Sequence, residues 1–125
     1  MESVSINFFR FQKLEIYQLS KDLVKNVYIL MKKFPSEERF ALIPQLSRAA
    51  VSVPSNIAEG AGRKNTKEFL QFLYISLGSA SELHTQLIIS QNLSYLKDTQ
   101  LIIELNEIRK MLVSLIHSIS KNNTH

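Results

Sequence analysis

Residues 101–119 read LIIELNEIRKMLVSLIHSI, and apolar side chains return in this stretch every three or four positions. The members of the row are Leu101, Leu105, Ile108, Leu112, Leu115 and Ile119. This spacing places them on one face of an α-helix, because the helix has 3.6 residues per turn. Asp98 precedes the row as a candidate N-cap, and the chain after Lys121 is expected to fray. The stretch therefore predicts a helix that buries one face in a core.

The same spacing predicts three further helices upstream. One covers residues 13–34 and ends at Pro35, and the next begins near Pro44 and stops at Gly60 and Gly62. The third starts after Asn65 or Thr66, where Asn65 and Glu68 form a capping pair, and runs to about Gln91. The predicted core rows are Ile16, Leu19, Leu23, Val27, Leu30 and Phe34; Leu46, Ala50, Val53 and Ile57; and Phe69, Leu73, Ala80, Leu83 and Leu87.

Four helices without strand signals predict an all-α protein, an antiparallel up-and-down four-helix bundle. The bundle is expected to cover residues 13–121, after a partly ordered N-terminal segment 1–12 and before a disordered tail 122–125. Two rows of apolar residues exceed what the core requires: Leu70, Leu77 and Ile88, and Ile102, Val113 and Ile116. They indicate either a subunit interface or a wide core face.

Composition narrows the class of protein. The chain has 125 residues, which suits one domain, and it contains no cysteine, which excludes a disulfide framework, a thiolate nucleophile and a cysteine zinc site. No segment reads as a signal peptide or membrane span, so we expect a cytoplasmic protein without membrane partners. The net charge of +4 and the pI of about 9.4 favour polyanionic partners such as nucleic acid.

Residues 49–63, AAVSVPSNIAEGAGR, keep helical spacing across Pro54. Proline cannot donate to the carbonyl of Ala50, so a bend or a water-filled gap is expected there. A polar stripe lies on the side of the helix opposite the core row and contains Arg48, Ser52, Ser55 or Asn56, and Glu59. Small residues on the third helix, Ser76, Gly78, Ser79, Ala80 and Ser81, predict a close approach to this segment, with Glu82 meeting Arg48. We favour a structural joint over a binding pocket here.

Two groups of basic residues are candidate nucleic-acid contacts. A group of residues clusters away from most of the core row of the first helix: Tyr17, Lys21, Lys25, Tyr28 and Lys32, with Arg10 if the helix reaches it. Lysines interleaved with tyrosines suit phosphate contacts combined with base stacking, although a solvated helix face has the same composition. The second group, Arg63, Lys64 and Lys67, surrounds the start of the third helix, where free N–H groups favour an anion. A nucleotide-triphosphatase loop is not indicated, because the Gly-Lys-Ser/Thr order is missing.

Several ordered blocks resemble the four-helix-bundle proteins encoded within intervening sequences of bacterial 23S ribosomal RNA genes. They are KLEIYQ (13–18), KFP (33–35) with Glu38, QLSRAAVSVPSNIAEG (45–60), and GSASEL (78–83) with Gln86 and Leu87. The resemblance covers nearly the whole chain, and the block 45–60 is specific. Ser47 stands where the family often has a second basic residue, so a role that needs paired arginines is not expected.

The resemblance implies a bundle that assembles into a ring, a homopentamer, and has no known catalytic activity. A relative that is similar in fold, the accessory variability protein of diversity-generating retroelements, is a basic ring that binds a reverse transcriptase and nucleic acid. The partners to expect are therefore copies of the chain, RNA or DNA, or a nucleoprotein such as a reverse transcriptase.

No enzyme class is favoured by the residues themselves. A di-iron bundle needs Glu-x-x-His pairs, and no glutamate here has a histidine three positions on, so neither a metal site nor a cofactor is expected. Arg109 and His117 are too far apart for the motif of helical ribonucleases. The leading hypothesis is a non-enzymatic, ring-forming bundle that binds structured RNA or a nucleoprotein partner through a basic surface. The alternative is a purely structural or protein-interaction scaffold, and a hydrolase dependent on His84 or Glu59 is a third, less favoured hypothesis.

Overall fold

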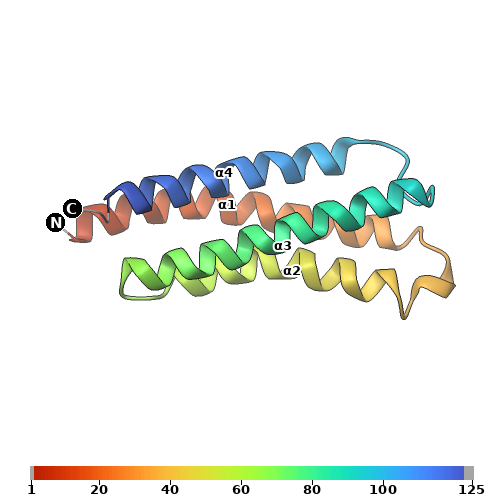
Figure 1. The fold of residues 1–125 in the computed structure, drawn as a ribbon, viewed down its shortest axis with the longest axis horizontal. Coiled ribbons are helices and arrows are strands. Elements are labelled where there is room, and N and C mark those ends of the chain that lie inside the picture. The colour runs from red at the N-terminus through yellow and green to blue at the C-terminus, as the bar shows by residue number, and fades with distance from the viewer. Residues whose placement is uncertain (1, 123–125) are drawn as a thin grey trace.

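A computed structural model describes the backbone of residues 2–122 and the side chains of residues 15–122. It contains four α-helices, α1 (Glu2–Met31), α2 (Leu42–Ala61), α3 (Thr66–Asn92) and α4 (Gln100–Asn122), with a short 3-10 helix, η1 (Ser36–Glu38), between α1 and α2. No strand occurs within residues 2–122. Successive helices run in opposite directions (Figure 1), which confirms the predicted all-α up-and-down bundle.

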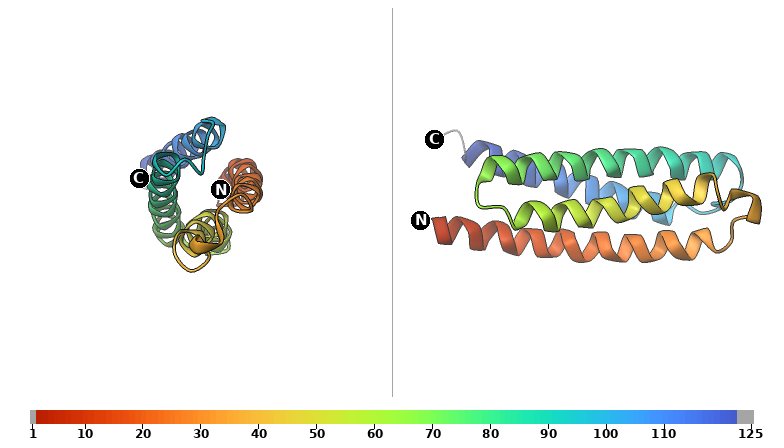
Figure 2. Two further views of the ribbon diagram at one scale, coloured as in Figure 1. Left: turned by 90° about the vertical axis from the view of Figure 1, so that its right-hand side faces the viewer. Right: turned by 90° about the horizontal axis from the view of Figure 1, so that it is seen from below.

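The helices occupy the corners of a square when the bundle is viewed along its axis (Figure 2, left). Each helix packs against its neighbours in the chain, and α4 also packs against α1. As a result, α1 lies diagonally opposite α3, and the most extensive packing joins α2 to α3. No helix within the described residues is long and apolar enough to cross a membrane.

The first helix is longer than the sequence indicated. It begins at Glu2 instead of near Lys13, so the described part of the N-terminal segment continues the backbone of α1. The side chain of Arg10 lies outside the described residues. At the other end of the chain, Asn122 closes α4, and residues 123–125 of the expected tail are also outside the described residues.

The core confirms the predicted rows with one change on α1. All the predicted positions on α2 and α4 are buried, and so are those on α3 apart from half-buried Phe69. On α1, Leu19 is 41% exposed, and Ser20 is fully buried in its place. Position 20 lies one turn from Ile16 on the inward face, and its hydroxyl can be buried because it donates to the carbonyl of Tyr17 at 3.0 Å.

Capping interactions set the starts of the last two helices. Asn65 Oδ1 accepts from the backbone N–H of Glu68 at 2.8 Å, and its Nδ2 donates to Glu68 Oε2 at 2.7 Å, so the predicted capping pair is confirmed. Asp98 Oδ1 accepts from the backbone N–H of Gln100 at 3.1 Å. Helix α4 itself begins at Gln100, two residues after the predicted cap.

A tyrosine joins the two loops at the end of the bundle away from the termini. The Tyr95 hydroxyl donates to Glu38 Oε2 at 2.9 Å, and its ring lies 4.8 Å, centroid to centroid, from that of Phe34. This hydrogen bond, followed by burial and the negative charges of Glu38 and Glu37, raises the pKa of Tyr95 above its ordinary value. The contact ties the α1–α2 connection to the α3–α4 loop.

Candidate nucleic-acid interface

One side of α1 carries an uninterrupted row of basic and aromatic residues. Lys21, Lys25, Tyr28 and Lys32 are exposed, and Tyr17 is half-buried at one end of the row. The two acidic side chains described on this helix, Glu15 and Asp22, lie about 100–120° around the helix from the centre of the row, and Asp22 is three residues before Lys25. Among the described side chains none of these three lysines forms an ion pair. The row, called the α1 row below, therefore presents unneutralised positive charge.

The α1 row borders α2. On the opposite flank of α1, Asn26 donates to Glu104 Oε1 of α4 at 2.9 Å, which places the α4 contact on that side. Between Tyr17 and Lys21 of α1 and the facing side of α2 lies a groove of ≈ 610 Å³. Its residues, named the α1/α2 groove below, are Tyr17, Lys21, Pro54, Ser55, Ala58, Glu59, Gly62 and Arg63. The amino group of Lys21 lies 4.9 Å from the centroid of the Tyr17 ring, a cation–π contact.

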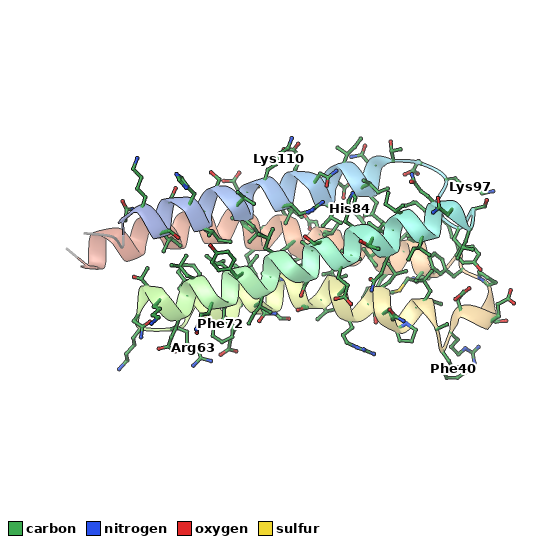
Figure 3. All side chains as sticks on the ribbon, in the orientation of Figure 1. Phe40, Arg63, Phe72, His84, Lys97 and Lys110 are labelled. Atoms are coloured by element: carbon green, nitrogen blue, oxygen red, sulfur yellow. The ribbon has the colours of Figure 1, made fainter. Side chains whose placement is uncertain are left out.

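Arg63 is held by three partners at the end of the groove. Its Nη2 lies 2.7 Å from Glu59 Oε2 and its Nη1 3.9 Å from Glu68 Oε1, and its guanidinium lies 4.8 Å from the Phe72 ring centroid (Figure 3). Two carboxylates thus offset the charge of Arg63, and it serves as a clamp between α2 and α3. Lys64 and Lys67 are exposed and unpaired within the described structure, so they carry the positive charge of this loop.

The polar stripe of α2 divides between two neighbouring helices. On the α3 side, Ser52 Oγ and Ser79 Oγ lie 2.7 Å apart, and Asn56 Nδ2 donates to the carbonyl and the hydroxyl oxygen of Ser52 at 2.8 and 2.9 Å. Ser55 and Glu59 instead line the α1/α2 groove. The stripe is therefore partly a joint and partly the wall of an open site.

The α2–α3 joint is closed by small residues. Buried Ser76 donates to the carbonyl of Val53 at 2.8 Å, next to buried Pro54, and α2 remains helical through this proline. A Cβ at Gly60 would lie 2.7 Å from Phe72 Cβ and 3.0 Å from Phe69 Cδ1, so only glycine allows this approach. Gly78, which the sequence placed in this joint, is exposed and has no atom within 4 Å of a built Cβ. Gly60 is the residue that permits close packing. The sequence indicated it only as the end of the second helix, so its packing role was not predicted.

Arg48 and Glu82 are near each other without pairing. Both line a pocket of ≈ 390 Å³ beside the joint, together with Ser52, Ser79 and Phe40. No ion pair joins them in the described structure, so the predicted contact does not form in the single chain. Both residues are exposed, and an exposed pair gains little over separate hydration. Phe40, 89% exposed, points away from the bundle at this end (Figure 3).

The sequence matches the family model of the 23S rRNA-intervening sequence protein over residues 12–114. The chain belongs to this family. The match takes in α2 and α3 in full and most of α1 and α4, and it confirms the resemblance found from the sequence blocks. It includes the α1/α2 groove in full.

A solved structure that matches this chain shares the fold. It is a protein of unknown function from the S23 ribosomal protein family of Bacteroides thetaiotaomicron, 24% identical, with a TM-score of 0.77 over 85% of this chain and 98% of that one. At 24% identity, this likeness supports the fold of the chain, and it says nothing about activity. No curated protein sequence matches this chain.

The outer face of α3, diagonal to the α1 row, differs from it in composition. From Phe69 to Asn92 the helix has one acidic or basic residue, Glu82, apart from His84. Tyr74, Ile75 and Ile89 are 57%, 51% and 40% exposed on the outer face. Of the surplus apolar residues predicted from the sequence, Ile116 is buried, Val113 is exposed and the other four are half-buried. Large exposed apolar side chains are not confined to α3: α1 also carries Leu19, Tyr28 and Ile29, and α4 carries Ile103 and Val113.

The described residues offer no group suited to metal chemistry. No three histidine, aspartate or glutamate side chains among them gather as ligands, and His84 and His117 lie on different helices, the first half-buried and the second exposed. The α1 row and the α1/α2 groove expose cations, aromatic rings and hydroxyl groups beside the carboxylate of Glu59.

Proposed function

We propose that this family member is a non-enzymatic, ring-forming bundle that binds structured RNA, or a nucleoprotein that contains it, through the α1 row. The observation that carries the proposal is the row itself: three exposed lysines without ion pairs, interleaved with Tyr17 and Tyr28, and without an acid among them. Cations neutralise phosphates and exposed rings stack on bases, which is the combination that nucleic-acid surfaces use.

Assembly strengthens this surface. One chain offers only three described lysines in the α1 row, but a ring repeats the row and sums its field around an axis. The outer face of α3 supports self-association, because an exposed helix face with a single acid and three large apolar side chains suits contact with protein. The family resemblance implies five copies. Placing α3 at the contact leaves the diagonally opposite α1 open to RNA.

The test is a charge reversal with a matched control. Lys21→Glu combined with Lys25→Glu should lower the affinity for a stem-loop RNA at least tenfold, because two phosphate contacts become repulsions. Lys97→Glu combined with Lys110→Glu changes the net charge equally on other surfaces (Figure 3) and should change the affinity less than threefold. Equal losses in both variants would contradict a specific α1 surface.

Light scattering on the same samples tests the ring. All three proteins should have a mass of about five times 14.4 kDa, because neither charge reversal touches the outer face of α3. A mass near that of one chain at micromolar concentration would contradict assembly. An intact ring without RNA binding would favour the alternative, a protein-interaction scaffold, for which the apolar face of α3 is the supporting observation.

A further inference from the structure

We propose that the α1/α2 groove binds one unstacked nucleotide of a single-stranded segment, with its base on Tyr17 and its phosphate at Lys21. This inference rests on the proposed function and names the kind of RNA segment that the surface selects. Structured RNAs present such nucleotides in loops and bulges. The groove unites a residue pair of the α1 row with residues of α2 and of the turn after it, most of which are exposed.

The dimensions and lining of the groove suit one nucleotide. Its volume of ≈ 610 Å³ falls within the range of small-ligand sites. On the α2 side, Pro54, Ala58 and Gly62 provide surfaces with little side-chain bulk, whereas the α1 side provides one ring and one cation. A flat, apolar base fits between such walls, and the cation at the rim fits the phosphate.

Tyr17 is the stacking surface. Its ring is half-buried, so the bundle holds it in place and little conformational freedom is lost on binding. The Lys21 ammonium group, 4.9 Å from the ring centroid, shows that a ring face is open to a partner. A base that stacks on this face displaces the Lys21 ammonium group. Because the lysine side chain is flexible, the ammonium group can then move to the phosphate of the same nucleotide. Stacking and charge neutralisation therefore act on the same nucleotide.

Glu59 sets the orientation of the base. Its Oε2 is engaged by Arg63 at 2.7 Å, and no hydrogen bond to its Oε1 is present among the described residues, so Glu59 keeps an acceptor oxygen on a side chain that lines the groove. A carboxylate repels phosphate and accepts from N–H groups, so the base edge should point to α2 and the phosphate to α1. Adenine, cytosine and guanine have an exocyclic amino group to donate, whereas uracil can donate only its ring N3–H, which lies between two carbonyl oxygens that repel a carboxylate. The groove should therefore discriminate against uracil.

A duplex cannot use this site in the same way. Its bases are stacked on each other, and a half-buried tyrosine cannot enter the stack without unpairing a base. The remaining lysines of the α1 row still contact duplex phosphates. Single-stranded RNA should therefore bind more tightly than duplex RNA of equal length, and the difference should depend on Tyr17.

The decisive experiment compares a mixed-sequence single-stranded RNA with its duplex. Tyr17→Leu should weaken single-strand binding about tenfold, since stacking of one base contributes about 1–3 kcal/mol. It should leave duplex binding within twofold. The control is Val113→Ala at an exposed position of α4, away from the α1 row and from the outer face of α3, which should alter neither affinity. Equal affinities of the wild type for both RNAs, or an equal loss for both in Tyr17→Leu, would overturn the inference.

Tyrosine fluorescence provides a readout that does not depend on a destabilising substitution. The chain has four tyrosines and no tryptophan, so quenching by a stacked base is directly observable. Single-stranded RNA should quench the wild type. Tyr17→Phe should keep the affinity within threefold, because phenylalanine still stacks, and should lose most of the quenching. Undiminished quenching in Tyr17→Phe would place the stacked base elsewhere and overturn the inference.

Base preference tests the role of Glu59. Oligo(A) and oligo(C) should bind the wild type more tightly than oligo(U), and Glu59→Gln should reduce this preference at least threefold. An unchanged preference would contradict the assigned orientation. If Lys21→Glu with Lys25→Glu weakens binding to every RNA without any single-strand preference in the wild type, the nucleotide site fails and the proposed function stands. If the wild type retains no RNA at all, both fail.

Discussion

Helix α2 has two flanks of opposite character. Toward α3 it is closed: Gly60 admits Phe72 at a distance that no other residue allows, and Ser76 bonds to the α2 backbone. Toward α1 it leaves an open groove in front of Tyr17 and Lys21. The difference arises because Gly60 of α2 and the serines Ser76 and Ser79 of α3 let these two helices approach closely, whereas α1 turns a ring and a long lysine to α2. The closed flank should carry stability and the open flank binding.

On the closed flank, substitution of Gly60 should cause the largest loss of stability. Gly60→Ala places a methyl group against Phe72 and Phe69, and separating the two helices should lower the free energy of unfolding by about 1–3 kcal/mol. Urea unfolding followed by circular dichroism measures the change.

Gly62→Ala is the control for this substitution. Gly62 lines the open groove, its φ of −82° suits alanine, and a Cβ there would lie no closer than 3.6 Å to another atom. This variant should be unchanged or more stable by up to about 1 kcal/mol. If Gly60→Ala tolerates urea as well as Gly62→Ala, the joint is not closely packed.

Two serines provide a smaller test of the same contrast. Ser76→Ala removes a buried hydrogen bond to the carbonyl of Val53 and should lower the free energy of unfolding by about 0.5–1.5 kcal/mol. Ser55→Ala, on the exposed wall of the groove, should change it by less than about 0.5 kcal/mol. Chemical denaturation at a fixed protein concentration distinguishes these values, and equal losses would remove the distinction between the flanks.

Periodicity predicted the fold because each helix repeats its apolar residues at helical spacing. The number of helices, their order and nearly all core positions followed from that repeat. The repeat did not predict that Ser20 is buried instead of Leu19, because both positions border the inward face. Only the packing of the neighbouring helices and the bond from Ser20 to the Tyr17 carbonyl decide which one is buried.

The sequence predicted most residues of the candidate site, but it did not predict which of them lie together. The sequence placed Tyr17 and Lys21 on a basic face, and it placed Ser55 and Glu59 in a separate polar stripe. That they share one groove depends on how α1 and α2 are rotated, which no local pattern records. The clamp on Arg63 depends on a contact with Phe72 of α3, so its partial neutralisation also required the tertiary structure.

The salt dependence of RNA binding tests the central claim most directly. If Lys21, Lys25 and Lys32 neutralise phosphates, the logarithm of the affinity for single-stranded RNA should fall with the logarithm of the salt concentration with a slope of about −2 or steeper per bound chain. Lys21→Glu with Lys25→Glu should flatten that slope. A wild-type affinity that does not change between low and high salt would contradict a phosphate-binding surface on α1.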